Sequence, residues 1–382
     1  MRIACVCGAR PNFVKLAAVV EAMRPHRELR PFVVHTGQHY DERLSAAMFE
    51  DLALPRPDFH LEVGSGSHAM QTAEVMQRFE PVVLEERPDL VLVVGDVNST
   101  VACSLVAAKL GIAVAHVEAG LRSFDRSMPE ELNRVVTDAL SDLLFVSEPS
   151  GMANLRREGV GEEHIFFVGN VMIDTLLRHV VRARSSDVLE RLGLRPGEHA
   201  VVTLHRPGNV DAPGRLVAVV DLLESLAARL AVVFPMHPRA RAQLAAAGLL
   251  ARLEHRLHLL EPQGYLDFLR LLSTARIVLT DSGGVQEEAT VLRIPCLTLR
   301  ENTERPATVV AGWNRIVGTD PDRVLAEVDT LLAGPVHGGA APEKWDGRAG
   351  ERIARVLLQL GPEGVRRLRK RPEVVAAAAG AR

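Results

Sequence analysis

Short apolar runs alternate with amphipathic stretches along almost the whole chain, and this alternation restricts the fold more than any other feature. The runs have the length of β-strands, and the stretches between them have the spacing of helices. Strands that alternate with helices form parallel sheets covered by helices on both faces. The sequence therefore predicts an α/β fold built from doubly wound parallel sheets.

The apolar runs fall into two series. The first series comprises Ile3–Cys7, Phe32–His35, Leu90–Val94, Ala113–Val117, Leu143–Val146 and Ile165–Val168. The second comprises Ala200–Thr203, Leu230–Phe234, Leu257–Leu260, Ile277–Leu279 and Cys296–Leu299. A chain of 382 residues has room for two ordinary domains. We predict two Rossmann-like domains, residues 1–172 and 173–352, and a C-terminal helix and tail, residues 353–382, that packs back on the first domain.

Composition excludes several classes of partner. The net charge is -3, so no basic field draws the protein to nucleic acid or to anionic lipid. No apolar stretch approaches the length of a membrane span. The four cysteines lie in apolar segments, which is typical of buried free thiols in a reducing compartment. We expect a soluble, cytoplasmic protein with neither a nucleic-acid nor a membrane partner.

The segment Thr280–Glu288 joins an apolar run to a helical stretch and carries two adjacent glycines. Glycines at such a turn bring backbone N–H groups close to a ligand, and the helix N-terminus adds partial positive charge. The segment therefore favours a phosphate or diphosphate, and Glu288, one turn further on, can accept ribose hydroxyls. The alternative is a helix capped by Asp281 or Ser282, with glycines for tight packing.

A second group of cations follows the first apolar run. Arg10 and Lys15 flank the expected start of a helix, where they form another anion site. The alternative is a pair of solvated cations. The segment has no Gly-x-Gly-x-x-Gly pattern, so a dinucleotide is poorly supported.

Carboxylates follow two strands of the first series. Asp96 either caps the next helix or points into a site. Glu118 closes a strand that should be buried, where a carboxylate is costly unless it is paired or functional. Arg122 is a candidate partner for it.

Three further ionisable residues stand at element ends. Glu130 and Glu131 fall in the first turn of a helix that begins at Pro129, where negative charge is favourable for structural reasons alone. His205 ends the first strand of the second series, a position that suits acid–base chemistry, phosphate contact or a structural hydrogen bond.

The two halves of the chain differ in chemistry. The first half gathers carboxylates, and the second gathers nucleotide-binding features. Gln263 and Phe268 are candidates for holding a base, and Arg305 is a candidate for a phosphate. We infer a nucleoside diphosphate bound mainly by one domain, with its other substituent facing acids and bases on the other. In parallel sheets such a ligand binds at the carboxyl ends of the strands.

These motifs resemble those of the UDP-N-acetylglucosamine 2-epimerase family over essentially the whole chain. The matching segments are Gly8–Pro11 with Lys15, Thr36–His39, Gly95 with Asp96, His116–Arg122, Pro129–Glu131 with Asn133 and Arg134, His205 with Arg206, Asp281–Glu288 and Glu304–Pro306. The resemblance implies two Rossmann-like domains of the GT-B type, an active site in the interdomain cleft, and a homodimer.

The resemblance also implies roles for single residues. Those implied to contact UDP are Arg10, Lys15, Gln263, Phe268, Ser282, Gly283, Gly284, Glu288 and Arg305. Those implied to serve catalysis are Asp96, Glu118, Glu130 and His205, with Glu130 rather than Glu131 in the catalytic position. The implied reaction interconverts UDP-GlcNAc and UDP-ManNAc by anti-elimination of UDP to a 2-acetamidoglucal and re-addition, with no metal or nicotinamide cofactor.

Some segments depart from the family pattern. Gly208 follows His-Arg-Pro where the family often has Glu, and Trp313 replaces a smaller residue. Gln38–Asp41 departs from the pattern of the allosteric branch, so activation by UDP-GlcNAc is not predicted. Arg122–Phe124 is similar to relatives that act on diacetamido-uronic UDP sugars. Such an epimerase, a hydrolysing variant, a glycosyltransferase and a non-catalytic nucleotide-sugar sensor remain the alternatives.

Overall fold

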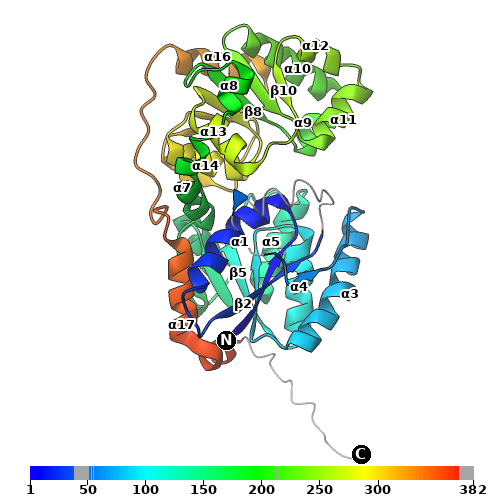
Figure 1. The fold of residues 1–382 in the computed structure, drawn as a ribbon, viewed down its shortest axis with the longest axis vertical. Helices are drawn as coiled ribbons and strands as arrows, with labels where there is room; N and C mark the ends of the chain where they lie inside the picture. The colour runs from blue at the N-terminus through cyan, green and yellow to red at the C-terminus, as the bar shows by residue number, and fades with distance from the viewer. Residues whose placement is uncertain (38–50, 53, 55, 212, 370–382) are drawn as a thin grey trace, which may run out of the picture.

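A computed structural model describes residues 1–37, 51–52, 54, 56–211 and 213–369 of the chain. The molecule has two lobes, each built on one parallel β-sheet (Figure 1). The predicted α/β class, with two doubly wound parallel sheets, is confirmed. The segment Gln38–Asp41 lies outside the described residues.

The sheet of the first lobe has seven strands in the order β3-β2-β1-β4-β5-β6-β7. Their bounds are β1 Arg2–Cys7, β2 Arg30–His35, β3 Phe59–His60, β4 Leu90–Val94, β5 Ala113–Ala119, β6 Leu143–Val146 and β7 Ile165–Phe167. The helices around it are α1 Arg10–Met23, α3 His68–Glu86, α4 Asn98–Lys109, α5 Pro129–Leu140, α6 Pro149–Arg157 and α7 Val171–Ala183. Alternate residues of the central strands pack against α1 and α7 on one face and against α3 and α4 on the other.

The sheet of the second lobe has six strands in the order β10-β9-β8-β11-β12-β13. Their bounds are β8 His199–Thr203, β9 Ala231–Pro235, β10 His258–Leu260, β11 Ile277–Thr280, β12 Cys296–Thr298 and β13 Asn314–Ile316. The longer helices around it are α10 Pro213–Ala227, α13 Tyr265–Ser273, α14 Gly283–Leu292 and α16 Pro321–Leu332. The core lies on both faces of this sheet as well, with α10 and α16 on one face and α13 and α14 on the other.

Two strands were not predicted, β3 and β13, and both lie at sheet edges. They have two and three residues, too few to give an apolar run in the sequence. All four cysteines are free and buried, as expected.

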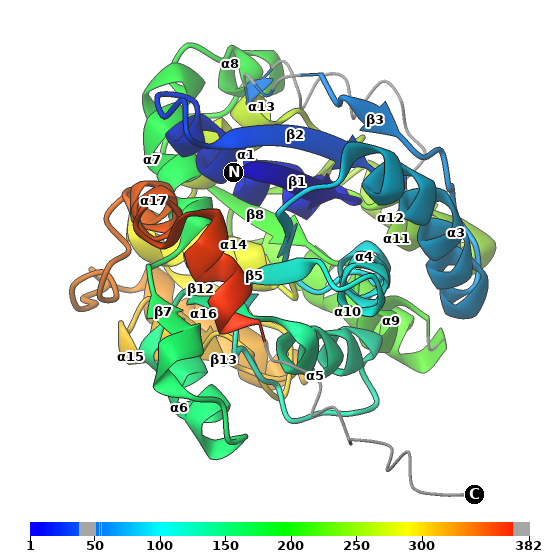
Figure 2. The ribbon, with the colours of Figure 1, turned by 90° about the horizontal axis from the view of Figure 1, so that it is seen from below.

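Helix α7 connects the two lobes, and the C-terminal part of the chain runs back from the second lobe to the first. Helix α7 packs against α1 of the first lobe and against α13 and α14 of the second. The last described helix, α17 (Ala349–Leu368), packs on α1, beside α7 (Figure 2). Its first N–H groups, at Ala349 and Gly350, donate to the buried carboxylate of Asp174. The boundaries at residues 172 and 352 stay a prediction.

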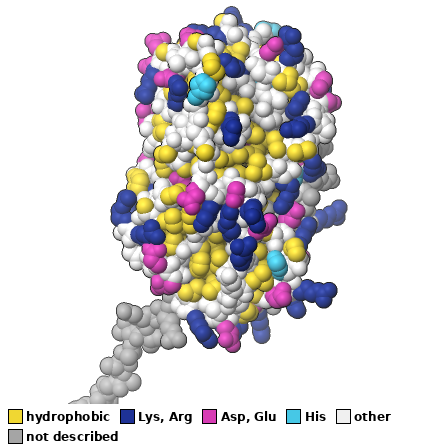
Figure 3. Space-filling model, turned by 90° about the vertical axis from the view of Figure 1, so that its left-hand side faces the viewer, with side chains coloured by type: hydrophobic (Ala, Val, Ile, Leu, Met, Phe, Trp, Pro, Cys, Tyr) yellow, Lys and Arg dark blue, Asp and Glu magenta, His cyan; other side chains and the backbone are white. Residues whose placement is uncertain are grey.

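Basic and acidic side chains are intermingled with hydrophobic ones over the face shown in Figure 3. Within the described ranges, no helix combines the length and the apolar character that crossing a membrane requires.

Candidate active site

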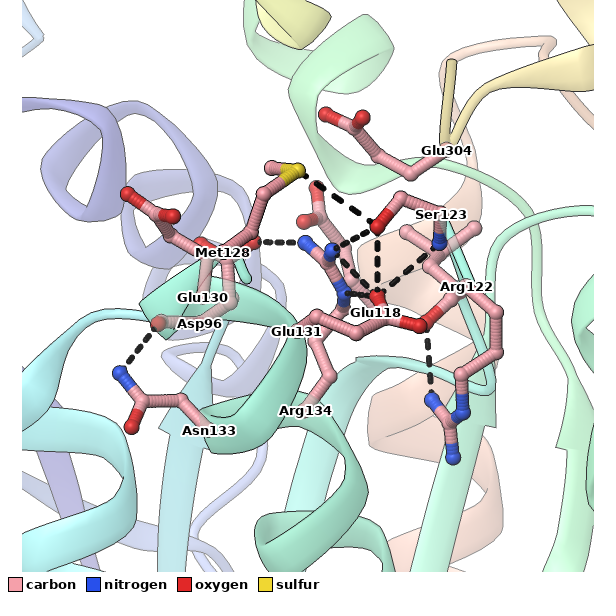
Figure 4. Close-up of polar contacts among 12 residues, drawn as sticks. Asp96, Glu118, Arg122, Ser123, Met128, Glu130, Glu131, Asn133, Arg134 and Glu304 are labelled. Carbon is pink, nitrogen blue, oxygen red and sulfur yellow. Dashed lines mark hydrogen bonds and ion pairs between the residues drawn. The ribbon is translucent and has the colours of Figure 1, made fainter. Parts of the chain in front are cut away.

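The site lies where the carboxyl ends of strands from the two sheets meet. Arg305, between β12 and β13, reaches Glu118 at the end of β5. Arg206, after β8, lies 3.9 Å from Glu130 at the start of α5. Figure 4 shows Asp96, Glu118 and Glu130 in this region with a residue of the second lobe above them. The topology thus brings together side chains far apart in the sequence.

Glu118 has the most constrained geometry in the site. Its φ is 73°, in the left-handed region that non-glycine residues rarely adopt, and strand pairing shifts register around it. Its carboxylate is buried, 2.6 Å from Lys15 Nζ and 3.3 Å from an Arg305 nitrogen. Left-handed backbone at a non-glycine residue costs about 1–3 kcal/mol and is concentrated at functional sites. The fold therefore holds this carboxylate in place at an energetic cost.

The expected pairing of Glu118 with Arg122 is wrong. The chain turns after β5, and the guanidinium of Arg122 instead lies 2.7 Å from Asp138 and 2.7 Å from Glu158. Asp138 also binds the imidazole of His116 at 2.6 Å. Arg122 thus belongs to an ionic group with Asp138, His116 and Glu158 and makes no ion pair with Glu118.

Asp96 is turned toward an arginine of the same lobe. The alternative that it caps the next helix is wrong, because Val97 is the residue before α4 and makes no side-chain cap. The Asp96 carboxylate is paired with Arg134 of α5. Burial raises its pKa, but Arg134 and Lys15 outweigh burial and hold the pKa of Asp96 below its usual value. Asp96 is therefore a carboxylate at neutral pH.

Glu130 and Glu131 have different surroundings. The carboxylate of Glu131 is buried and accepts N–H groups from Ser123 and Phe124 at 2.9 Å each. It also pairs with Arg134 at 2.6 Å. The side chain of Glu130 is 42% exposed and faces the second lobe. Glu131 therefore has a structural role, and Glu130 is the carboxylate open to a ligand.

Two cations, Arg10 and Lys15, were expected at the start of α1, and the structure describes the side chain of Lys15. Its ammonium is buried against Glu118. The alternative that Lys15 is a solvated cation is therefore wrong. The side chain of Arg10 lies outside the described part of the structure.

The glycine turn of the second lobe is closely packed. Ser282 precedes α14, and its side chain makes no cap hydrogen bond. A Cβ on Gly283 would lie 2.7 Å from Glu304 Oε1, and one on Gly284 would lie 2.7 Å from the methyl of Met172. Of the alternative interpretation, the tight packing of these glycines is therefore confirmed, whereas the cap from Ser282 is not formed.

Glu304 lies among arginines beside this turn. Its carboxylate is 2.7 Å from Arg300 and 3.5 Å from Arg206. Burial raises its pKa, but the guanidiniums of Arg300, Arg305 and Arg206 hold the pKa of Glu304 well below its usual range. Glu304 is therefore ionised, and the three guanidiniums more than offset its charge beside the α14 N-terminus, next to the predicted diphosphate position.

The alternative that Asp281 caps α14 is also wrong. Its carboxylate turns away from the helix and lies 2.7 Å from the Nδ1 atom of His205. It also accepts the backbone N–H of Arg206 at 2.9 Å. This geometry ties the end of β11 to the end of β8.

Two carboxylates of α14 are buried. Tyr265 OH lies 3.2 Å from Glu288, and burial raises the pKa of Glu288 to about 7. Glu287 lies 2.7 Å from Arg305. Burial raises the pKa of Glu287 to about 8, because the lowering by Arg305 is smaller and the nearby charge of Glu118 raises the pKa further. Sequence reasoning missed Tyr265 and Glu287, although Glu287 lies inside the glycine-turn motif.

The candidate base-binding residues belong to other parts of the second lobe. Gln263 follows β10 and donates to the carbonyl of Glu261 at 2.7 Å. Phe268, in α13, packs in part against the core beneath α13 and α14.

Comparison with known proteins places this geometry in a family. The model of the family described as UDP-N-acetylglucosamine 2-epimerase matches residues 21–358. A UDP-N-acetylglucosamine 2-epimerase homolog of Methanococcus maripaludis is 41% identical over 94% of this chain and 100% of its own length. The UDP-2,3-diacetamido-2,3-dideoxy-D-glucuronate 2-epimerase of Pseudomonas aeruginosa is 40% identical over 94% of this chain and 100% of its own length.

A solved structure agrees at the level of the whole fold. The crystal structure of the Methanocaldococcus jannaschii UDP-GlcNAc 2-epimerase in complex with UDP-GlcNAc and UDP has a TM-score of 0.89 and 41% identity. The match covers 94% of this chain and 100% of that one. The fold and the site together define a nucleotide-sugar epimerase of the GT-B-like class. This chain belongs to the UDP-N-acetylglucosamine 2-epimerase family.

Proposed function

We propose that this protein interconverts UDP-GlcNAc and UDP-ManNAc. The observation that carries the proposal is Glu118, a buried carboxylate on left-handed backbone between Lys15 and Arg305. Membership of the epimerase family supports the same substrate class. A carboxylate held in this way is suited to proton transfer at a defined atom of a bound sugar.

The reaction must break a C–H bond that no adjacent carbonyl activates. Elimination solves this problem, because the C2 proton leaves as the anomeric C–O bond to UDP breaks. Re-addition of UDP, with a proton delivered to the opposite face, inverts C2. We assign these proton transfers to Asp96, Glu118 and Glu130, with His205 assisting. Groups of this kind contribute about 10²- to 10⁴-fold each in rate.

The second lobe supplies the binding of UDP in this proposal. The α14 N-terminus, with Ser282, Gly283 and Gly284, and the cations Arg10, Lys15 and Arg305 stabilise the departing diphosphate. Glu288 accepts the ribose hydroxyls, and Gln263 and Phe268 hold the base. Neither a metal nor a nicotinamide has a role in it.

Proton NMR of UDP-GlcNAc incubated with the protein in heavy water tests this function. We expect deuterium at C2 and signals of the manno epimer. If UDP-GlcNAc is bound but neither deuterium nor the manno product appears, the proposal is wrong. Free ManNAc with UDP would identify the hydrolysing variant, and acceptor-dependent release of UDP would identify a glycosyltransferase.

A UDP-diacetamido-glucuronate is the second candidate substrate. The relative named for that sugar is 40% identical to this chain, almost as similar as the 41% relative named for UDP-GlcNAc. A thermal-shift panel with UDP, UDP-GlcNAc and the UDP-diacetamido-glucuronate, followed by product NMR, separates the two substrates.

We also propose that the chain forms a homodimer, as the family resemblance implies, and that its domains divide at residues 172 and 352. Light scattering of the purified protein tests the first proposal. Expression of residues 1–172, with residues 353–382 supplied as a separate chain, tests the second proposal. A stable, folded complex would support these boundaries, and an unfolded one would contradict them.

A further inference from the structure

We infer that Asp281 is a positioning residue for the reaction, because it fixes which ring nitrogen of His205 carries a proton. This inference rests on the proposed function for its catalytic meaning. The geometry that carries it is independent of any substrate. Asp281 is fully buried at the end of β11, and His205 stands at the end of the neighbouring strand β8.

The two oxygens of Asp281 share the backbone N–H of His205 and otherwise have different partners. Oδ2 accepts the N–H of His205 at 3.1 Å, the N–H of Arg206 at 2.9 Å and the side-chain amide of Asn209 at 3.0 Å. Oδ1 accepts the same N–H of His205 at 3.2 Å and lies 2.7 Å from the Nδ1 atom of His205. Burial raises the pKa of Asp281, but the imidazole of His205 and the hydrogen bonds to it outweigh burial and lower the pKa overall. The group is therefore an acceptor only, and Nδ1 must donate to it.

This donation leaves Nε2 as the ring nitrogen that gains and loses a proton. The His205 side chain is 41% exposed, whereas Asp281 is buried. Because Nδ1 faces Asp281, Nε2 lies on the edge of the ring away from that carboxylate. In its protonated form, an imidazole held in this way can give the Nε2 proton to an oxygen of the departing diphosphate, and the neutral ring, with Nδ1 still donating to Asp281, can take it back at the same atom. A ring with its proton on Nε2 in the neutral form cannot accept one there.

Asp281→Asn inverts this arrangement without a change in volume. Two donors that reach only Oδ2, the N–H of Arg206 and the side-chain amide of Asn209, keep the amide oxygen in that position, so the NH₂ group faces Nδ1 of His205. Nδ1 must then accept, and the proton of the neutral ring moves to Nε2. Asn209→Ala is the matched control, because it removes one donor from the same carboxylate and leaves the contact to Nδ1 in place.

The test is ¹⁵N NMR of the full chain with labelled histidine, at about pH 8.5, two units above the ordinary histidine pKa. The His205 signals are assigned by their loss in His205→Asn. We expect a proton on Nδ1 in the wild type and in Asn209→Ala, and on Nε2 in Asp281→Asn. The same tautomer in wild type and Asp281→Asn would overturn the inference.

Kinetics provide a second readout. We expect Asp281→Asn to lower kcat by at least about 10²-fold while the Kd for UDP changes less than about threefold. We also expect no further loss when it is combined with His205→Asn. Equal additive losses in the double variant would overturn the inference, because the two residues would then act separately. If the wild type turns over no UDP sugar, the proposed function fails, and the NMR result still decides the positioning of His205.

Discussion

Lys15 Nζ lies 2.6 Å from Glu118 Oε2, which joins α1 to the end of β5 inside the protein. The two side chains are 7% and 2% exposed. Charges withdrawn from water in this way are stable only while they are paired. Because Arg305 of the second lobe approaches the same oxygen at 3.3 Å, this carboxylate links the two lobes as well.

Lys15→Met should destabilise the protein. It leaves Glu118 with Arg305 as its remaining partner, so we expect a loss of about 3 kcal/mol, the lower end of the cost of breaking a buried pair. Urea unfolding measures the change. Lys109→Met, at an exposed lysine that ends α4, is the control and should change stability by less than about 0.5 kcal/mol. Equal stability of the two variants would contradict the buried pair.

Glu130→Gln and Glu131→Gln should affect different properties: the first should lower turnover, and the second should lower stability. Glu131→Gln weakens a buried acceptor of two N–H groups and Arg134, so we expect a loss of stability of about 1.5–3 kcal/mol. Glu130 makes no comparable set of contacts among the described residues. Glu130→Gln should therefore leave the unfolding free energy almost unchanged and lower kcat by about 10²-fold or more.

Thermal unfolding and steady-state turnover of both variants separate these roles. A stable Glu131→Gln protein with no activity, together with a fully active Glu130→Gln protein, would reverse the assignment.

UDP binding should depend on pH through Glu288. Burial raises the pKa of this group to about 7, and only the ionised carboxylate can accept both ribose hydroxyls. We therefore expect affinity to rise with pH up to about 7, by at most about tenfold per unit, and to level off above it. Calorimetry of UDP binding between about pH 5.5 and 8.5 measures this dependence.

Two variants isolate that effect from the titration of UDP itself, whose terminal phosphate has a pKa near 6. In Glu288→Gln, only the titration of the UDP phosphate should contribute to the pH dependence of binding. Tyr265→Phe removes the hydroxyl that lowers the pKa of Glu288, so its midpoint should move to higher pH. Identical pH profiles for all three proteins would exclude Glu288 as the titrating group.

Gly283→Ala should be destabilising because its Cβ would meet Glu304 Oε1 at 2.7 Å, and the Glu304 carboxylate cannot move away without losing its ion pairs with Arg300 and Arg206. Overpacking of this kind costs about 1–3 kcal/mol. Gly214→Ala is the matched control, since a Cβ there has no neighbour within 4 Å among the described atoms. If Gly283→Ala unfolds at the same temperature as Gly214→Ala in a thermal scan, the close contact is wrong.

The sequence predicted the sheets because a strand buried on both faces leaves a local signature, a short apolar run. The rule that ligands bind at the carboxyl ends of parallel strands also made Asp96 and Glu118 in the first lobe, and Arg305 in the second, candidates for one ligand site. Edge strands β3 and β13 left no such signature, because so few residues are buried in them.

The partners of the charged groups could not be predicted in the same way. Arg122 is four residues from Glu118 yet pairs with Glu158, and Lys15 is 103 residues from the carboxylate that it binds. The left-handed backbone of Glu118 likewise depends on how β5 packs against its neighbours. These features are set by tertiary contacts, and neither the spacing nor the type of the residues reports them.

In the proposed reaction, Glu118 moves a proton at C2 of a bound UDP sugar. The most direct measurement follows UDP-GlcNAc by proton NMR in heavy water with the wild type and with Glu118→Gln. We predict deuterium at C2 and manno product with the wild type, and neither with Glu118→Gln, although the variant still binds UDP almost normally. Undiminished exchange at C2 in Glu118→Gln, or a tenfold loss of UDP affinity with normal turnover, would contradict the account.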